Sequence, residues 1–431
     1  MALIEDIIKE NLQNAVDIQY ETIAGKREEP VYLHDQLMTE EFSPNMTYET
    51  ASSDSVRVTA DVVAYDSPLP IKKRDALKSA SGNIPKLGLK YMLNEKQMNV
   101  LFQLQRTPGA KAQLARKIFA DSDKCIYGIK ELLDRMLLSA ISSGVMLIPE
   151  AENTGTAVRV TYDISGDNKF GATYKWTESS ATPLSDITRV MEAARDNRNV
   201  SIREIWMDKR TLDNIRNNAE IKERFAFQSN FVGGNIPMLN RDQMVSLFLQ
   251  ELGANLNIVD RKFTVEKNGT RTVVDGWEEG KVVFTQSKNL GQLQWSLSAE
   301  DQDRVEGVTY AKPNSYILIG MSKTSEPVSK KTFGQAIALP VLQDVDSIYY
   351  LDANEAATDA QTEGDANFDY TSADGQTTDS YTRASVITAL NLASKKVKAT
   401  DADTDAELLE KINMLSENQI VIFEDNIVAA V

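Results

Sequence analysis

The chain has 431 residues, enough to bury a large core and to form two to three domain-sized units. Its formal net charge of −16 at pH 7 argues against binding of nucleic acid through a basic surface. The acidic balance fits a container wall that must not adhere to nucleic acid inside it, or simply a surface charge that keeps the protein soluble.

Single copies of histidine and cysteine narrow the chemistry further. With only His34 and Cys125, the chain can form no internal disulfide and no cysteine-based zinc site, and most histidine-dependent catalysis is excluded. No stretch reaches the roughly 18 apolar residues of a membrane span. The first ten residues mix isoleucines with charged residues and lack the pattern of a signal peptide. We therefore expect a soluble protein made in the cytoplasm, with no membrane partner.

The first fifty residues predict a polar arm. Residues 1–10 have the spacing of an amphipathic helix, but the stretch that follows contains Pro30 and Pro44 and shows little periodicity. Such a segment buries itself poorly, so we expect it to be mobile unless it lies on a partner.

Two strand patterns flank a long basic loop. Residues 55–65 and 86–93 both alternate apolar and polar positions, and we expect them to pair as a long hairpin. A structureless tip of this length usually serves a function or marks disorder. On an acidic chain a basic tip can contact another copy of the same protein; a solvated loop is the alternative. The tip carries four basic residues, Lys72, Lys73, Arg74 and Lys78.

The strongest helical signal follows this hairpin. Asn94 is placed to cap a first helix, and residues 110–143 then carry apolar side chains at steps of three and four. Gly144 is well placed to end the helix in a left-handed conformation. Unbroken, this helix would be roughly 50 Å long at 1.5 Å per residue, whereas a break at residues 121–123 would divide it. Cys125 falls on the apolar stripe, which predicts a buried core thiol.

The second half of the chain alternates strands and helices, which predicts a mixed α/β unit. A helix expected at 183–195 is followed by a strand at 202–207 and by a helix for which Asp208 is the expected N-cap. Asn268–Gly269 predicts a tight hairpin turn.

Residues 351–380 contain eight acidic residues and no Lys or Arg, which predicts an exposed linker or loop. A small C-terminal module is expected from residue 381. Its Asp401–Asp405 run lacks the glycine and glutamate that a calcium loop needs at its sixth and twelfth positions. Phosphate-binding glycine motifs are also absent. The sequence therefore predicts no catalytic residue, no cofactor and no metal site.

The order of arm, hairpin, long helix, mixed unit and returning strands resembles the Hong Kong 97-type capsid fold, an α+β fold. Over roughly residues 50–350 the local sequence is similar to the phage major capsid protein E family of lambda-like tailed phages. The similar segments are YDSPLPIKKRD at 65–75, SASGNIP at 79–85, PLSDI at 183–187, IWMD at 205–208, WEEGKVVF at 277–284 and GQAIALPVL at 334–342.

The resemblance implies a division of the chain into parts named as in that fold. The expected parts are an N-terminal arm (1–54), an E-loop hairpin (55–93), the spine helix with the first P-domain strands (94–175), an A-domain (176–300), returning P-domain strands (301–350), an acidic linker or loop (351–380) and an added C-terminal module (381–431).

The resemblance also implies a structural role and no enzymatic activity. The expected protein is a major capsid protein of the virion that forms hexamers and pentamers of an icosahedral head. This head would enclose double-stranded DNA without sequence-specific binding, with scaffold, portal and decoration proteins as further partners. Lys72, Lys73, Arg74 and Lys78 are then expected to contact acidic surface on an adjacent subunit. An encapsulin-like compartment and a carboxylate-dependent enzyme are the alternatives.

Overall fold

The computed structural model describes residues 4–21, 32–52, 78–107, 109–153, 157–162, 164–228, 238–326, 328–356, 367–371, 378–394, 405–416, 419–420 and 422–423. The chain forms two units, the first made of residues 1–172 and 176–354 and the second of residues 173–175 and 355–431. The two larger sheets of unit 1 each contribute to an apolar core of their own.

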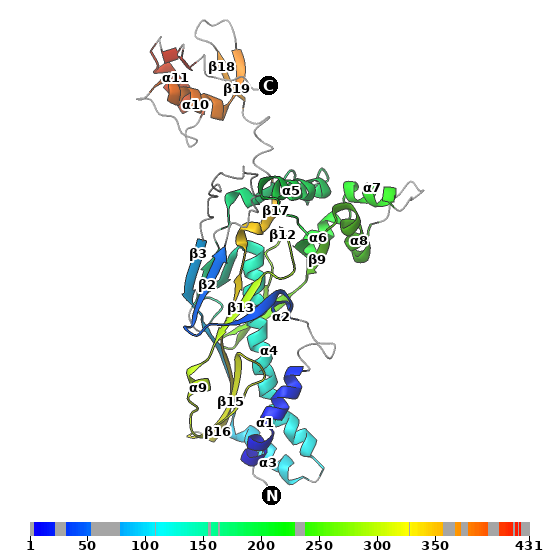
Figure 1. Ribbon diagram of the computed structural model, residues 1–431, viewed down its shortest axis with the longest axis vertical. Helices are drawn as coiled ribbons and strands as arrows, with labels where there is room; N and C mark the ends of the chain where they lie inside the picture. The colour runs from blue at the N-terminus through cyan, green and yellow to red at the C-terminus, as the bar shows by residue number, and fades with distance from the viewer. Residues whose placement is uncertain are drawn as a thin grey trace, which may run out of the picture. The chain divides into compact units, whose positions relative to one another are not determined.

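The larger sheet of unit 1 has a central long strand, β16 (Val328–Leu342) (Figure 1). Strands β15 and β4 both pair with the first part of β16, up to Ala336 and Ile337 respectively. Strand β13 pairs with the remaining part, from Ile337 to Leu342. All three pairings are antiparallel. The outer strands are β14, which pairs with β15, and β1, which pairs in parallel with β13. The bounds of the other five strands are β1 (Met38–Phe42), β4 (Lys86–Leu93), β13 (Gly291–Ser296), β14 (Val308–Ala311) and β15 (Ile317–Ser325).

The long helix α4 (Lys111–Ser143) packs against β16 and is unbroken over its 33 residues. Close packing is possible because β16 has Gly334 at the contact, where an added Cβ would lie 2.7 Å from the Cβ of Cys125. Gly144 ends the helix at φ +70°, as its position predicts. The polar residues 121–123 do not interrupt the helix, because Asp121 pairs with Lys124 and the Ser122 hydroxyl donates to the Phe119 carbonyl.

The first helix is packed within unit 1, whereas the sequence predicted a polar arm that needs a partner. In α1 (Ile4–Glu21), Ile8, Leu12 and Val16 are buried in the main core of unit 1, where α1 packs on α4 and β14. Their spacing of four residues places them on one face of the helix. Other elements of the same chain therefore cover this apolar stripe. Helix α3 (Glu95–Arg106) begins at Asn94 with a reciprocal capping box, as predicted.

Strand β4 pairs with β16. Residues 55–65, its expected hairpin partner, lie outside the described part of the chain, so the expected hairpin stays a prediction. Alternate residues of β4 are covered: Leu87 is buried, and Leu89 packs against Gly128 of α4. An antiparallel hairpin pairs β2 (Thr47–Ser52) with β3 (Lys78–Asn83).

The second sheet of unit 1 has the order β7-β17-β12-β8-β9. Strands β8 and β9 are parallel, and β12 runs antiparallel to both β8 and β17. The expected alternation of strands and helices is confirmed here, and Asp208 caps α6 by accepting from the amides of Arg210 and Thr211. The bounds are β7 (Lys169–Ala172), α5 (Pro183–Arg198), β8 (Glu204–Asp208), α6 (Lys209–Ile215), α7 (Ala219–Gln228), α8 (Arg241–Leu252), β9 (Asn255–Val259), β12 (Lys281–Thr285) and β17 (Tyr349–Ala356).

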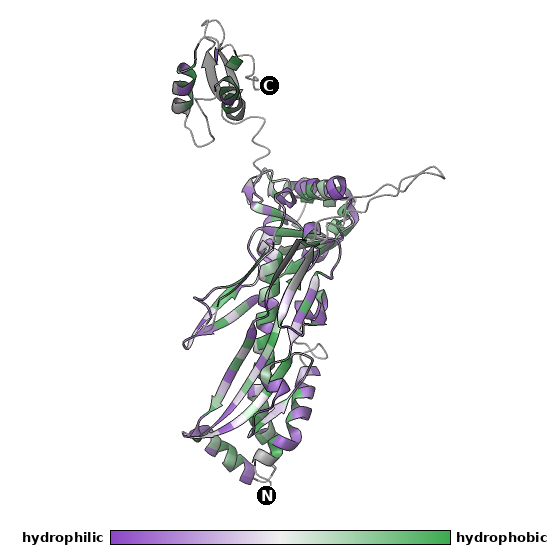
Figure 2. Ribbon diagram, turned by 60° about the vertical axis from the view of Figure 1, so that its left-hand side comes forward, coloured by the Kyte–Doolittle hydropathy of each residue, from purple (hydrophilic) through white to green (hydrophobic). Residues whose placement is uncertain are grey.

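Short elements complete unit 1. The Asn268–Gly269 turn joins β10 to β11 with both residues at positive φ, as predicted. Figure 2 shows hydrophobic residues at many positions along the central strands and the long helix α4. Among the helices that the structure describes, none is long and apolar enough to cross a membrane. The remaining elements are α2 (Leu33–Leu37), β5 (Val145–Ile148), β6 (Val158–Thr161), η2 (Gly166–Asn168), β10 (Lys262–Lys267), β11 (Thr270–Asp275), α9 (Ala299–Gln302) and η3 (Val345–Ser347).

The predicted linker at 351–380 contains strands. Strand β17 extends through Ala356 with Leu351 and Ala353 buried in unit 1. Strands β18 (Asn367–Thr371) and β19 (Thr378–Thr382) pair as a hairpin in unit 2. The linker was predicted from the acidic composition of the whole stretch. That average gave no weight to Leu351 or to the alternation of aromatic and polar residues in NFDYT, which are local strand signals.

Unit 2 has a small core of its own. It packs β18–β19 with α10 (Arg383–Ala393) and α11 (Asp405–Asn413). Val386, Leu390, Leu408 and Phe423 are fully buried in this core. The described residues of 419–423 are helical.

Candidate assembly surfaces

The basic tip expected to contact a neighbouring subunit lies mostly outside the described residues. This holds for Lys72, Lys73 and Arg74, whereas Lys78 begins β3 and its backbone pairs with Ser52 of β2. The contact therefore stays a prediction.

The base of the β2–β3 hairpin is fixed on unit 1. The Tyr48 ring packs so closely over Gly82 that an added Cβ would lie 2.7 Å from it. The Ile84 amide donates to the Met46 carbonyl at 2.8 Å, and Tyr48 and Ile84 are both buried in the main core. The segment that joins the two strands therefore starts and ends at an anchored base.

A buried polar cluster fastens the segment after α1 to the long helix. The carboxylate of Asp134 on α4 accepts from the His34 backbone amide at 2.9 Å and lies 2.8 Å from the His34 Nδ1. The other oxygen of Asp134 lies 3.2 Å from Arg261 Nε. The side chains of His34 and Asp134 are both completely buried. The one histidine of the chain thus serves as a buried anchor.

Neighbouring charges extend this cluster toward α1. Lys130, also fully buried, donates to Asp35 at 2.6 Å, and its Nζ lies 4.7 Å from the centre of the Tyr20 ring. Glu131 accepts from the Tyr32 hydroxyl and pairs with Arg261. Because buried charges are tolerated when paired in this way, the cluster fixes the path of residues 32–37 on the subunit.

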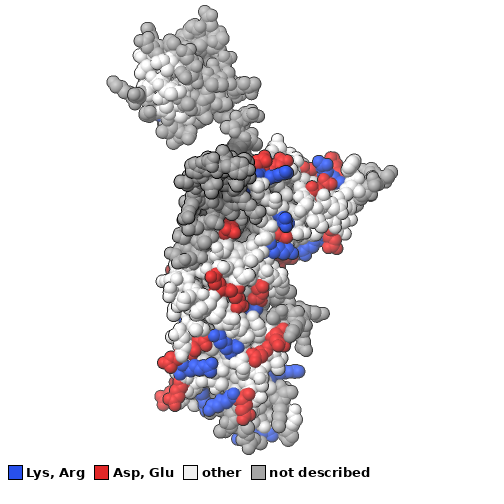
Figure 3. Space-filling view, in the orientation of Figure 1, with Lys and Arg blue, Asp and Glu red and all other residues white. Residues whose placement is uncertain are grey.

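Large apolar side chains remain in water at the end of unit 1 formed by α7 and α8. Phe227 on α7 is 83% exposed, and Met238 and Leu249 are each about half exposed. On the face shown in Figure 3, acidic and basic side chains of unit 1 are interspersed without a large area of one sign. Exposed apolar side chains mark contacts with other proteins where they form a contiguous patch.

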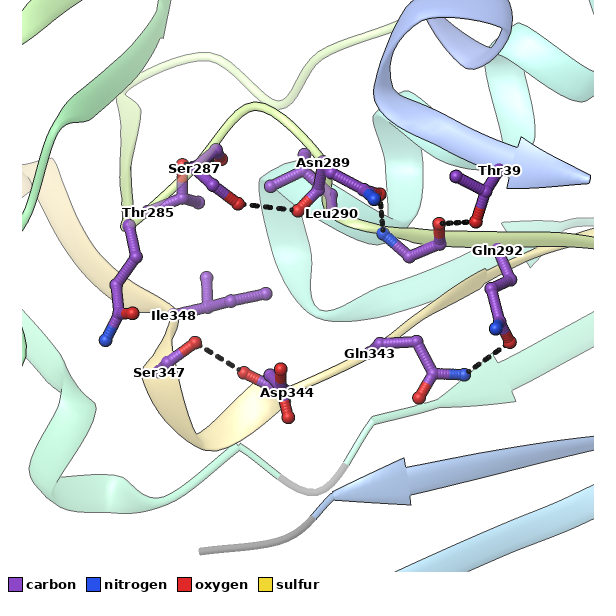
Figure 4. A pocket seen from close by; sticks show the side chains of 12 residues that line it. Thr39, Thr285, Ser287, Asn289, Leu290, Gln292, Gln343, Asp344, Ser347 and Ile348 are labelled. Atoms are coloured by element: carbon purple, nitrogen blue, oxygen red, sulfur yellow. Dashed lines mark hydrogen bonds between the residues drawn. The ribbon is translucent and has the colours of Figure 1, made fainter. Parts of the chain in front are cut away.

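A polar pocket of about 220 Å³ lies where the two sheets of unit 1 meet (Figure 4). The side chains in it bond to one another or to nearby backbone: Gln343 donates to Gln292, Ser287 to the Asn289 carbonyl and Ser347 to the Asp344 carbonyl. Asp344 is the one ionisable group among the described lining residues. These hydrogen bonds hold together the corner where the two sheets meet. The described lining residues include no pair of groups suited to acid–base chemistry.

The described part of the chain contains no group of three or more His, Cys, Asp or Glu residues that could hold a metal ion. The three carboxylates of the cluster around His34 are each engaged by a cation, which fits a structural arrangement: Asp35 by Lys130, and Asp134 and Glu131 by Arg261.

Cys125 occupies the predicted core position. It is fully buried, and burial raises the pKa of its thiol to about 12. Since the thiolate is the reactive form, we expect negligible alkylation by iodoacetamide at pH 8 in the folded protein and complete alkylation in denaturant. Mass spectrometry of the intact chain measures this. Rapid labelling of the native protein would contradict the assignment as an inert core thiol.

The described surfaces thus combine anchors within one chain with exposed apolar side chains, and a comparison with known families gives the class of protein. The sequence profile of the family described as phage major capsid protein E matches residues 21–353. The chain belongs to this family. It is therefore a structural capsid protein, and its mixture of helices and sheets agrees with the α+β class expected from the sequence. The match ends beside the boundary of unit 1 at residue 354, so nearly all of unit 2 lies beyond it.

Solved structures of phage capsid proteins are similar to this capsid protein at low identity. A putative capsid protein of a prophage in E. coli CFT073 is 13% identical, with 79% of this chain and 98% of that chain covered and a TM-score of 0.47. The capsid protein of cyanophage A-1(L) is 14% identical, with coverage of 77% and 95% and a TM-score of 0.40. An encapsulin complex from Synechococcus elongatus PCC 7942 is 8% identical, with coverage of 75% and 87% and a TM-score of 0.35. No curated protein sequence matches.

Proposed function

We propose that this capsid protein assembles into hexamers and pentamers of an icosahedral phage head that encloses double-stranded DNA. The observation that carries the proposal is the family match over residues 21–353, which spans almost all of unit 1. We further propose that the chain is made in the host cytoplasm, has no enzymatic activity and assembles with scaffold, portal and decoration proteins.

Two physical features support a shell. The apolar side chains exposed on α7 and α8 would leave water at a contact between subunits, which favours association. The net charge of −16 repels DNA phosphates, so a wall built from many copies would not adhere to the DNA inside. Symmetry multiplies modest contacts of this kind over the whole shell.

Within this proposal the parts of the subunit take the roles expected of the fold. The helix α4 is the spine helix, the sheet around β16 belongs to the P-domain, and the sheet around β8 with α5–α8 is the A-domain. The β2–β3 hairpin is the base of the E-loop. Residues beyond 354 form the added module.

The DNA content of particles tests the proposal. Particles isolated from the host are expected to protect double-stranded DNA from added nuclease. Particles that hold protein cargo and protect no DNA would contradict a phage head and indicate an encapsulin-like compartment.

The basic tip gives a more local prediction. Replacing Lys72, Lys73, Arg74 and Lys78 together by glutamate is expected to reduce the yield of shells at least tenfold, because the tip would then repel the acidic neighbour. The isolated subunit should keep its unfolding midpoint, since a surface charge change away from other features has little effect on folding. Shell yield is measured by sedimentation.

The matched control exchanges the four residues while keeping their charge, with lysines replaced by arginine and Arg74 by lysine. This control should assemble normally. Normal shells from the glutamate variant would rule out the proposed contact.

A further inference from the structure

A second pocket of unit 1, of about 590 Å³, lies between α1, α3 and the strands β14–β16. Its size is that of a typical binding pocket. Its apolar walls are made by Ile8, Met98, Leu101, Phe102, Val308 and Met321, and the charged residues among the described lining residues are Lys9, Lys323 and Lys330. The pocket therefore combines apolar walls with positive charge.

Lys330 is the unusual member of this lining. The residue is only 6% exposed, and its Nζ has no hydrogen-bond partner among the described residues. The carboxylate of Asp121 acts on its charge, but Asp121 is already paired with Lys124 at 2.8 Å. A buried ammonium group is costly unless an anion compensates it.

The register of the sheet adds a second positive charge. Lys330 on β16 lies directly opposite Lys323 on β15, so the two side chains leave the same face of the sheet. Like charges directly opposite on neighbouring strands destabilise the pair. Burial lowers the pKa of Lys330 to about 8, which still leaves its amine mostly protonated at pH 7. Lys330 thus places a buried ammonium group in this pocket without a hydrogen-bond partner among the described residues.

An anion with an apolar stem would complement both properties of the pocket. A small inorganic anion would pair with the amine but leave the apolar walls uncovered, whereas an Asp or Glu side chain with its apolar neighbours would fill both. Phe102 of α3 lines the pocket and is 39% exposed, so the apolar lining reaches the surface of the molecule at this point. This continuity favours a protein surface as the occupant.

A second copy of the chain supplies such a surface. The sequence has 63 Asp and Glu against 47 Lys and Arg, so its surface is rich in carboxylates. We propose that the pocket receives a carboxylate side chain of a neighbouring copy, which pairs with Lys330. This inference rests on the proposed assembly into shells.

Zero-length cross-linking tests the contact directly. Shells are assembled from equal amounts of unlabelled and ¹⁵N-labelled chain and treated with a carbodiimide, which joins an amine to a carboxylate that touches it. The expected product is a peptide pair that links Lys330 to an Asp or Glu, with both isotope labels in one pair. Links only within one copy, for example to Asp121, or no link at Lys330 in intact shells, would overturn the inference.

Stability measurements separate this contact from a role in folding. The Lys330→Met variant is expected to unfold at the same or a higher denaturant concentration as an isolated subunit, because a buried charge is removed. Its shells should dissociate at a lower concentration than wild-type shells. Lys330→Arg keeps the charge and should keep shell stability while losing the cross-link. The neighbouring Lys331→Met is the matched control and should leave shells unchanged.

A decrease in the stability of subunit and shell alike for Lys330→Met would show a folding role and overturn the inference. Unchanged stability of Lys330→Met shells would overturn it as well. If the wild-type chain forms no shell under any condition, the proposed function itself fails, and that outcome is distinct from intact shells in which Lys330 has no partner.

Discussion

Replacing Asp134 by alanine is expected to lower the free energy of unfolding of the subunit by about 3–5 kcal/mol, the usual cost of removing one partner of a buried ion pair. The Asp134 carboxylate is fully buried and accepts a hydrogen bond from the His34 amide. It also contacts the His34 ring and forms an ion pair with Arg261. Without it, Arg261 loses a buried counterion and the His34 amide loses its acceptor. The change also frees residues 32–37 from α4.

Urea unfolding of the purified subunit, followed by tryptophan fluorescence, measures this effect. The matched control is Asp260→Ala, because Asp260 pairs with Lys209 at 3.0 Å while 47% of its side chain is exposed. An exposed pair is worth about 0–1 kcal/mol, so the control should change little. Equal losses in the two variants would contradict the anchoring role of Asp134.

Replacing Leu133 by alanine is expected to cost about 2–5 kcal/mol of unfolding free energy. Leu133 lies on α4 and is fully buried in the main core of unit 1. Its truncation removes apolar contacts and leaves a cavity in the packing around α4. Assembly should fall as well, since less of the chain is folded.

The control for this variant is Leu147→Ala on β5, where the side chain is 43% exposed. The same atoms are removed there without a buried cavity, and the expected loss is below about 1 kcal/mol. A loss at Leu133 no larger than that at Leu147 would contradict the placement of α4 as the centre of the core.

Local signals in the sequence predicted the elements whose cause is local. The repeat of apolar residues in 110–143 and the glycine at 144 are both properties of neighbouring residues, and α4 has the expected length and end. The caps at Asn94 and Asp208 and the turn at Asn268–Gly269 follow for the same reason.

Partners distant in the sequence were beyond this reasoning. Alternation showed that β4 is a strand with one covered face, but a pattern of period two does not say which strand lies beside it. Likewise, α1 has an amphipathic stripe that fits a neighbouring subunit as well as its own α4. Only the folded chain shows that Ile8, Leu12 and Val16 are covered within one copy.

The buried charges illustrate the same limit. His34 and Asp134 lie far apart in the sequence, and no residue adjacent to either of them in the sequence indicates that they pair. Lys330 stands in a run that looks like an ordinary exposed strand with two lysines, and nothing near it indicates that one of them is buried. Burial of a single side chain depends on the packing of α1 and α3 over the sheet.

The most direct test of the account is electron microscopy of the purified chain, with sedimentation velocity on the same sample. The account predicts closed shells, or hexamers and pentamers that close into shells when the neighbouring phage proteins are added. A stable dimer that resists assembly even with those proteins present would contradict a capsid subunit.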